Sequence, residues 1–352
     1  MTITRLLRGV LKSFAVLAVL GVLRIVALLG FLWLENRSEV TLPTPTGSFA
    51  VGRAIHDWTD SVALDPLAPV PGTKRELLVW IWYPSAAGQS VVMDDYLPAG
   101  LRPKASHGYV VVGFDAPYRT GRIVFPDGRI MGRTEQNNPE TCVVADRAQI
   151  ERCVSRVLTA WTGDIAFVLD RLARLNASDS SGKFTGRLDM TRVGVFGHSL
   201  GGAVAAQFCH EDSRCKAGID IDGAPHGSVI QAGLRQPFMF LLSDHGDGSD
   251  PASIQIGADI QSIYDRIPPD RSLRAAIRGA FHFTFSDDGA LLKSRIVRGV
   301  LRMLGKLGID GRRQLAVTTY CVHTFFDMYL KGVGGSRLRI LSPLYPEIQV
   351  LE

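Results

Sequence analysis

The longest apolar stretch of the chain lies near its N-terminus. Residues 14–34 read FAVLAVLGVLRIVALLGFLWL, in which 18 of 21 positions are apolar, two are glycine and one is Arg24. About 20 such residues in a helix cross the ~30 Å hydrocarbon core of a bilayer. Arg24 costs roughly 2.5–3.5 kcal/mol on insertion scales, which the surrounding leucines and valines outweigh. The pattern predicts a membrane-anchoring helix.

A cleaved signal peptide is the alternative interpretation, because three basic residues (Arg5, Arg8 and Lys12) precede the apolar run. No A-x-A-like cleavage site follows, and the run continues beyond Arg24, which favours the uncleaved anchor. In both cases the basic flank stays in the cytoplasm and the rest of the chain is exported. We therefore expect a membrane-anchored protein whose main domain is extracytoplasmic, either periplasmic or extracellular.

Further along the chain, short apolar runs alternate with helical stretches. Helical periodicity marks residues 145–175, expected as two pieces that meet near Gly163, and later residues 288–306 and 312–331. Alternation of strands and helices predicts an α/β fold, with a mostly parallel sheet covered by helices on both faces. The expected strands, rich in β-branched and aromatic residues, are Phe49–Ile55, Leu77–Tyr83, Tyr109–Phe114, Val193–Phe196, Ala217–Ile221, Pro237–Leu242 and Leu273–Ile277.

Composition sets the domain organisation. The 352 residues are 46% hydrophobic and 21% charged, which suits a packed globular protein and excludes global disorder. Residues 37–49 are polar and rich in proline, threonine and serine, as a linker is, and no second linker follows. We expect a basic flank and transmembrane anchor over residues 1–36, a linker over 37–49 and one α/β domain over 50–352.

The net charge of +5 does not indicate a nucleic-acid partner. The first 40 residues carry five basic and two acidic side chains, so most of the excess positive charge lies within or beside the anchor. No basic run interleaved with aromatic residues and no groove-reading motif is present. The sequence leaves the oligomeric state open.

Cysteine usage excludes a disulfide scaffold and a zinc site. The five cysteines include no C-x-x-C pair and no Cys/His cluster at zinc spacing, so we expect no structural zinc site. Cys142 and Cys153, or Cys209 and Cys215, are close enough in sequence to form disulfides in an exported protein. Buried free thiols are the alternative.

The most informative peptide is the GHSLG motif around Ser199, which a strand enters and a helix leaves. This is the G-x-S-x-G nucleophile elbow, whose small residues permit a sharp strand-to-helix turn. Ser199 Oγ is then exposed at the carboxyl edge of the sheet. The backbone N–H of Leu200, at the start of the helix, points at the oxyanion of the reaction.

A serine nucleophile needs a base and a carboxylate that orients it. Among the histidines after Ser199, His282 follows an expected strand and lies in a late loop, where a base belongs. The acid is less well defined. Asp220 and Asp222 end the strand that follows the elbow helix, whereas Asp244 and Asp247 follow the next strand. The residue pattern alone does not decide which pair contains the acid.

Several peptides together resemble the plasma-type platelet-activating factor acetylhydrolases and their bacterial relatives, members of the α/β-hydrolase superfamily. They are GHSLGGA, IDIDGAPHG, SDHG, GAFHFTFSD, WTGDIAFVLDRL and FFDMYLKG, spread over most of residues 75–335. The resemblance places the acid after the strand that follows the elbow helix, at Asp222, and so implies a triad of Ser199, Asp222 and His282. It also implies cleavage of short-chain or phospholipid-type carboxylic esters without a metal or other cofactor.

The chain departs from the family pattern at one place. Relatives carry a further strand and a glycine-containing loop before the SHGYVVV segment, and that loop supplies the second oxyanion donor. Here residues 83–84 lead through MDDYLPAGLRP directly to Ser106. We expect either a gap in the sheet or a shift of the strand Tyr109–Phe114 into contact with both neighbours. In the second case the loop Asp115–Gly121 is a candidate for a substitute N–H donor.

Three functions follow from these patterns. The first is a membrane-tethered serine esterase that acts on small or lipid esters. The second is a general carboxylesterase or polyester hydrolase with the same triad. The third is a pseudoenzyme or binding protein that retains the triad and has lost one oxyanion donor, a loss that costs about 2.7–4 kcal/mol of transition-state stabilisation.

Overall fold

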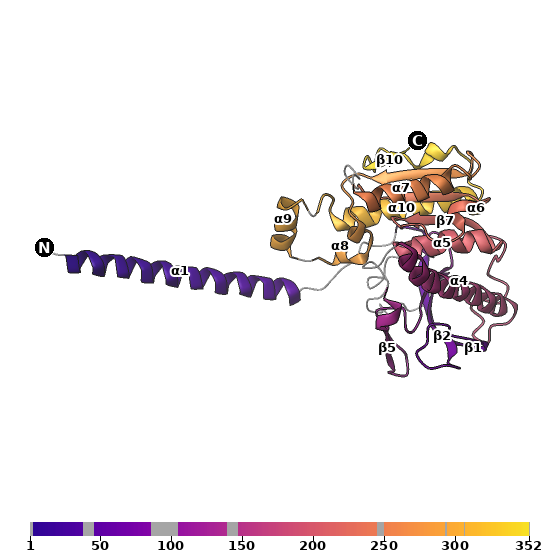
Figure 1. The fold of residues 1–352 in the computed structure, drawn as a ribbon, viewed down its shortest axis with the longest axis horizontal. Coiled ribbons are helices and arrows are strands. Elements are labelled where there is room, and N and C mark those ends of the chain that lie inside the picture. Colours follow the sequence, from indigo (N-terminus) through magenta and orange to yellow (C-terminus); the bar gives the residue numbers. More distant parts are fainter. Residues whose placement is uncertain are drawn as a thin grey trace.

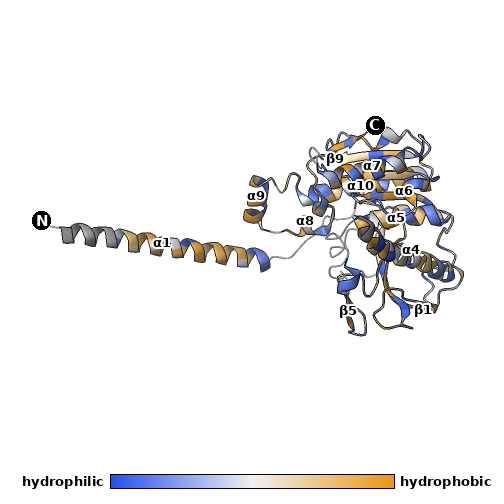
Figure 2. Cartoon of the chain, in the orientation of Figure 1, coloured by the Kyte–Doolittle hydropathy of each residue, from blue (hydrophilic) through white to orange (hydrophobic). Residues whose placement is uncertain are grey.

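A computed structural model describes residues 3–37, 46–85, 105–138, 147–244, 250–292, 294–305 and 307–351. The helix α1 (Ile3–Arg37) projects away from the rest of the molecule (Figure 1). Between Phe14 and Leu34 it is dominated by hydrophobic residues, coloured orange in Figure 2, and most of their side chains are exposed. By length and composition, residues Lys12–Arg37 are sufficient to cross a membrane. The expected apolar helix is therefore present.

Two sheets form the centre of the main body. The first is antiparallel, in the order β1-β2-β3, and consists of β1 (Ala50–Leu64), β2 (Lys74–Ser85) and β3 (Val111–Asp115). The second has the order β10-β9-β8-β7-β6. Its members β6 (Val193–His198), β7 (Cys215–Ile221), β8 (Phe238–Leu242) and β9 (Ser272–Ile277) are parallel, and β10 (Ile348–Val350) joins β9 antiparallel. A small hairpin of β4 (Arg122–Val124) and β5 (Ile130–Gly132) precedes the 3-10 turn η2 (Glu135–Asn137).

Helices cover both faces of the parallel sheet. On one face lie α4 (Arg147–Ala177), α5 (Leu200–Glu211), the short α6 (Val229–Ala232) and α7 (Pro251–Tyr264), and on the other lies α10 (Gly311–Leu330) (Figure 1). The smaller elements are η3 (His282–Phe285), α8 (Asp287–Leu291), α9 (Arg295–Met303) and η4 (Arg337–Ile340). The expectation of a parallel sheet with helices on both faces is confirmed.

The residues of β8 illustrate why this arrangement forms. Successive side chains of a strand point to opposite faces. Phe238 and Phe240 accordingly pack in the core that includes α4 and α7, whereas Met239 and Leu241 pack in the core that includes α10. Because both faces are buried, the strand reads as the uninterrupted apolar run FMFLL rather than as an alternating pattern.

Two helix predictions need correction. Residues 145–175 were expected as two pieces, but α4 is a single helix that continues through Gly163. The glycine serves packing instead, because a Cβ there would lie 2.9 Å from Nη2 of Arg75, whose Nη1 donates to the Gly163 carbonyl. Residues 288–306 were expected as one helix. The chain instead forms α8 and α9, and Ser294 caps the start of α9 by accepting the N–H of Val297.

Among the described strands, β3 and β6 are not paired with each other, at the point where the sequence predicts a missing strand. Within the described residues, β3 pairs only with β2 and β6 only with β7, and no backbone hydrogen bond joins β3 to β6. Of the two outcomes expected from the sequence, a gap and a shifted strand, the described strands show the gap.

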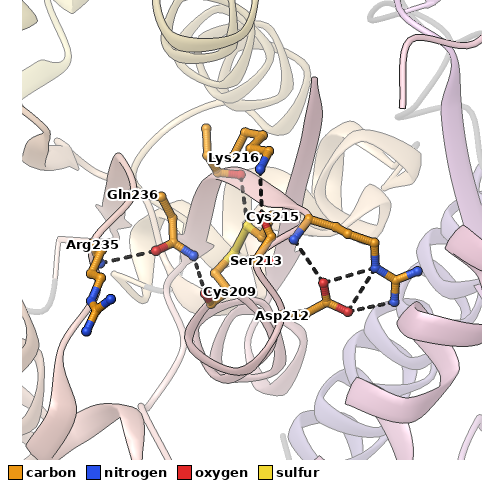
Figure 3. The surroundings of a disulfide bond; sticks show 9 residues. Cys209, Asp212, Ser213, Cys215, Lys216, Arg235 and Gln236 are labelled. Carbon is orange, nitrogen blue, oxygen red and sulfur yellow. Dashed lines mark hydrogen bonds and ion pairs between the residues drawn. A yellow bond between two sulfur atoms is a disulfide. The ribbon is translucent and has the colours of Figure 1, made fainter. Parts of the chain in front are cut away.

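A disulfide joins Cys209 at the end of α5 to Cys215 at the start of β7 (Figure 3). Between them, Asp212 binds the guanidinium of Arg214 and fixes the turn. Gln236, just before β8, donates to the carbonyl of Cys209 on the other side (Figure 3). Cys321 on α10 is a buried free thiol. Cys142 lies outside the described residues.

A buried ion cluster holds the loop after β3 in place. Arg119 donates to both carboxylate oxygens of Asp65 at 2.9 Å and to Asp164 of α4 at 2.7–2.9 Å. All three side chains are almost fully buried, and Arg75 adds a second cation 3.2 Å from Asp164. Burial raises the pKa of Asp164, to about 6, although the two guanidinium groups oppose the shift.

We predict that Arg119→Ala lowers the free energy of unfolding by about 3–5 kcal/mol, since it leaves two buried carboxylates without their shared partner. Arg129→Ala is the matched control, because Arg129 pairs with Asp57 and Glu76 while its side chain remains 45% exposed, and exposed pairs contribute about 0–1 kcal/mol. Chemical denaturation measures both values. Equal losses in the two variants would contradict the role assigned to the cluster.

Candidate active site

Ser199 occupies a strained turn between β6 and α5. Its backbone has φ 57° and ψ −128°, in a region that L-residues rarely adopt. Small residues around it make the turn possible, because a Cβ on Gly197 would lie 2.2 Å from the Gly201 carbonyl oxygen. The N–H of Ser199 donates to the carbonyl of Ile221 at 2.9 Å, which joins the turn to the end of β7.

The structure brings three of the residues identified from the sequence into one hydrogen-bonded chain. His282, at the start of η3, lies with Nε2 3.0 Å from Ser199 Oγ and with Nδ1 2.8 Å from Asp222 Oδ2. The Asp222 side chain is fully buried, whereas that of His282 is 34% exposed. One side of the imidazole therefore faces solvent and the serine, and the other faces a carboxylate shielded from water.

Asp222 is held by groups that the sequence analysis did not identify. Ser243, directly after β8, donates its N–H to Asp222 Oδ1 at 2.7 Å and its hydroxyl to Oδ2 at 2.8 Å. Asp222 itself has φ 55°, and its N–H donates to the carbonyl of Leu241. The only signal for Ser243 in the sequence is its place at the end of an apolar strand, a position that many residue types occupy.

The other candidate acids lie elsewhere. Asp244 accepts the N–H of Gly279 at 3.0 Å through Oδ2, so it closes the turn after β9. Asp247 lies outside the described residues. Asp220 points toward the elbow helix, where its Oδ1 would lie 1.9 Å from a Cβ on Gly202. Among the described carboxylates, the contact with His282 belongs to Asp222.

His198, within the elbow, positions His282. Its Nε2 lies 2.9 Å from the backbone carbonyl of His282, and the two rings are 4.7 Å apart. Burial lowers the pKa of His198, and the neighbouring charge of His282 lowers it further. A neutral ring with its proton on Nε2 donates to that carbonyl and holds the loop against the elbow.

Leu200 is the first residue of α5, and the first N–H groups of a helix have no partner within it. Its side chain packs beside Leu67, Val157 and Trp161. The loop Asp115–Gly121, the candidate for a second donor, uses part of its backbone internally. Ala116 N–H donates to Thr120 Oγ1, and Thr120 N–H donates to the Ala116 carbonyl. A donor role for this loop remains a prediction.

Asp220 is a buried acid beneath the site. Its side chain is 0% exposed, Oδ1 accepts the N–H of Gly223 at 2.7 Å, and Oδ2 has no hydrogen-bond partner among the described residues. Burial raises the pKa of Asp220 to about 8; the Gly223 N–H opposes this shift, and the charge of Asp222 adds to it. The carboxyl is therefore protonated at neutral pH.

A parallel sheet covered on both faces, with a sharp strand-to-helix turn that carries the G-x-S-x-G motif at the carboxyl end of one strand, fits a fold of the α/β-hydrolase type. A solved structure, the ferulic acid esterase from Streptomyces cinnamoneus, has a similar fold with a TM-score of 0.69 and 24% sequence identity, covering 88% of this chain and 99% of that one. The chain belongs to the family of platelet-activating factor acetylhydrolase, isoform II, whose model matches residues 144–332.

Curated relatives agree with this assignment. A probable 1-alkyl-2-acetylglycerophosphocholine esterase of Arthroderma benhamiae is 26% identical over 267 residues, which cover 70% of this chain and 60% of the relative. The platelet-activating factor acetylhydrolase of Cavia porcellus is 28% identical over 148 residues, 41% of this chain and 31% of the relative. The matches thus span less than two thirds of the relatives' lengths.

We predict that Asp220 makes a contribution to the stability of the wild-type protein that falls as pH rises from about 4 to 8. Native Asp220 retains a proton in this window that the unfolded chain has lost, so unfolding releases it, at a slope of up to about 1.4 kcal/mol per pH unit. Asp220→Asn keeps the acceptor for Gly223 and does not titrate, so its unfolding free energy loses this slope. Denaturant unfolding at several pH values tests the difference; parallel wild-type and variant curves would refute a protonated Asp220.

Proposed function

We propose that the protein is a serine carboxylic ester hydrolase that works through an acyl-enzyme on Ser199. The observation that carries the proposal is the unbroken hydrogen-bonded chain from Ser199 through His282 to the buried Asp222 at a strained elbow. A serine in a structural turn requires neither a histidine at 3.0 Å nor a buried carboxylate behind it. Family membership supports the same class of reaction.

The chemistry follows from this geometry. Ser199 Oγ attacks the ester carbonyl carbon while His282 Nε2 takes its proton, and Asp222 stabilises the imidazolium through Nδ1–H. The N–H of Leu200 donates to the tetrahedral oxyanion. When the intermediate collapses, the C–O bond breaks and His282 protonates the leaving alcohol. Water then attacks the acyl carbon with His282 as base, which releases the acid and restores Ser199.

The proposed substrates are esters with a short acyl chain, on phospholipids or on other lipophilic alcohols. The relative described as a probable 1-alkyl-2-acetylglycerophosphocholine esterase supports phospholipid substrates. The structural neighbour is a ferulic acid esterase, so esters of other alcohols or acids are a second candidate class of substrate. We also propose that α1 anchors the protein in a membrane, with the α/β domain (residues 50–352) on the extracytoplasmic side. The exposed apolar length of Lys12–Arg37 supports the anchor.

The short helix α9 supports a membrane-facing orientation. It lies on the side of the body from which α1 projects, and the N–H of Arg295 lies 3.2 Å from a carboxylate oxygen of Glu35, near the end of α1 (Figure 1). Ile296, Val300 and Met303 are exposed on it. A basic helix with exposed apolar residues is suited to the boundary between water and lipid.

We predict that a fluorophosphonate probe labels the wild-type protein and that Ser199→Ala abolishes the labelling. Asp222→Asn keeps the shape of the site but favours the wrong imidazole tautomer, so it should lower kcat about 10⁴-fold. Asp244→Asn changes a neighbouring carboxylate that accepts the N–H of Gly279, and it is the matched control that should retain activity. A folded wild-type protein without labelling would support the pseudoenzyme alternative and refute the esterase.

Substrate class is tested separately, by comparing kcat/KM for p-nitrophenyl acetate with that for a phospholipid carrying a short sn-2 acyl chain in vesicles. A lipid esterase should prefer the vesicle substrate by at least tenfold, because α1 and α9 hold the site at the bilayer. Removal of residues 1–36 should reduce hydrolysis of the vesicle substrate and leave the soluble ester unaffected. Equal rates on both substrates in the full chain would favour the general carboxylesterase.

A further inference from the structure

Asp220 lies on β7 two residues before Asp222, in a strand that otherwise buries apolar side chains. Its neighbours Ile219 and Ile221 pack in the core that includes α10, so the Asp220 side chain points to the opposite face, where α5 lies. The side chain is fully buried. Burial of a carboxyl group costs free energy that an apolar residue does not lose. The packing of the strand alone therefore does not explain an acid at this position.

The carboxyl of Asp220 contacts both halves of the site. On one side, its Oδ1 accepts the N–H of Gly223 at 2.7 Å and closes the turn in which Asp222 has φ 55°. On the other side, the same oxygen lies against Gly202 in the first turn of α5, where a Cβ would come within 1.9 Å of it. One oxygen atom thus touches the turn that carries the acid and the helix that follows the nucleophile.

The backbone of Ser199 meets the same two glycines. Its carbonyl oxygen accepts the N–H of Gly202 at 2.8 Å, and a Cβ on Gly223 would lie 2.4 Å from that oxygen. The elbow and the acid turn therefore pack together at Gly202 and Gly223, and the Asp220 carboxyl contacts both of these residues. A change in the volume or the hydrogen bonding of Asp220 shifts one turn relative to the other.

The relative position of the two turns decides whether the triad aligns. His282 lies 3.0 Å from Ser199 Oγ and 2.8 Å from Asp222 Oδ2, so a displacement of either turn lengthens one of these hydrogen bonds and weakens it. Ser243 holds the carboxylate of Asp222 from the end of β8. Asp220 instead holds the backbone turn of Asp222 from within β7 and contacts the elbow helix.

We propose that Asp220 is a positioning residue of the triad, whose buried carboxyl sets the distance between the elbow of Ser199 and the turn of Asp222 so that His282 spans the two. The role rests on the proposed ester hydrolysis through Ser199. Asp220 acts through the turn of Asp222 and does not touch the reacting atoms.

In this role Asp220 is the neutral acid. Burial raises the pKa of Asp220 to about 8, and the charge of Asp222 adds to the shift. Asp220 pairs with Gly197 of β6 and Phe240 of β8, which carry no charge, and the first turn of α5 has no acidic residue. His198, the next residue of β6, is turned to the opposite face. Ionisation near pH 8 therefore places a second negative charge beside Asp222 and repels its carboxylate.

Asp220→Val, in the full chain in nanodiscs, tests the role because valine suits a strand and offers no acceptor to Gly223. We expect kcat for p-nitrophenyl acetate to fall at least ~100-fold while KM stays within about twofold. Asp220→Asn keeps the acceptor and should restore kcat at pH 7 to within about fivefold of the wild type. Gln207→Leu is the matched control, because Gln207 of α5 is also buried and accepts the N–H of Val229 at 3.1 Å. Its kcat should equal that of the wild type.

Two measurements do not depend on the folding of the valine variant. Wild-type kcat should fall at least about threefold through an ionisation near pH 8, where Asp220 becomes charged, and that of Asp220→Asn should not. The low-field proton resonance of His282 Nδ1–H, identified by its loss in Asp222→Asn, reports the triad without turnover. It should weaken in the wild type above pH 8 and persist unchanged in Asp220→Asn.

A folded valine variant with wild-type kcat would overturn the positioning role and leave the esterase intact. So would an ionisation near pH 8 that persists in Asp220→Asn, or an equal loss of kcat in Gln207→Leu, which would reduce the effect to packing. A wild-type protein without turnover or fluorophosphonate labelling would instead refute the esterase. The His282 resonance then still decides the role of Asp220, since a signal that is the same in the wild type and Asp220→Asn at every pH overturns it.

Discussion

The close approach of α5 to the end of β7 is the constraint on which the site depends. Gly202 lies directly over the Asp220 side chain, and the N–H of Ser199 reaches the carbonyl of Ile221. Ser199 and Asp222, on the two sides of this contact, both have positive φ, and the side chain of His282 bridges them. Glycine at positions 197, 202 and 223 is therefore a requirement of packing, because a Cβ at each would lie within 2.5 Å of a neighbouring atom.

Much of this arrangement could be predicted from the residues. The apolar runs that form β6, β7, β8 and β9 are uninterrupted, so their burial on both faces was predictable, and the elbow motif marked Ser199. The acid could not be chosen from local pattern, because Asp222 and Asp244 each end an apolar strand. The selection depends on strand order and on the position of His282, which are tertiary properties. The family resemblance supplied the prediction of Asp222, between carboxylates that the local pattern could not distinguish.

Other features had no local signal. Ser243 supports Asp222 only because β8 lies next to β7, and the Arg119 cluster joins three segments that are distant in sequence. The break predicted in α4 and the single helix predicted over residues 288–306 were wrong for the same reason. Helical periodicity does not show what a glycine packs against or where a serine caps a new helix. The lack of pairing between the described strands β3 and β6 was predicted from the family pattern and not from the hydrophobicity of the chain.

The disulfide between Cys209 and Cys215 joins the helix that begins at Ser199 to the strand that leads to Asp222. In the loop-entropy model, closing so short a loop lowers the conformational entropy of the unfolded chain. This stabilises the folded protein by about 2 kcal/mol. The bond forms only under oxidising conditions. The segment between Ser199 and Asp222 is thus covalently closed only in an oxidising compartment, and the redox state of that compartment sets how firmly the two residues are held relative to each other.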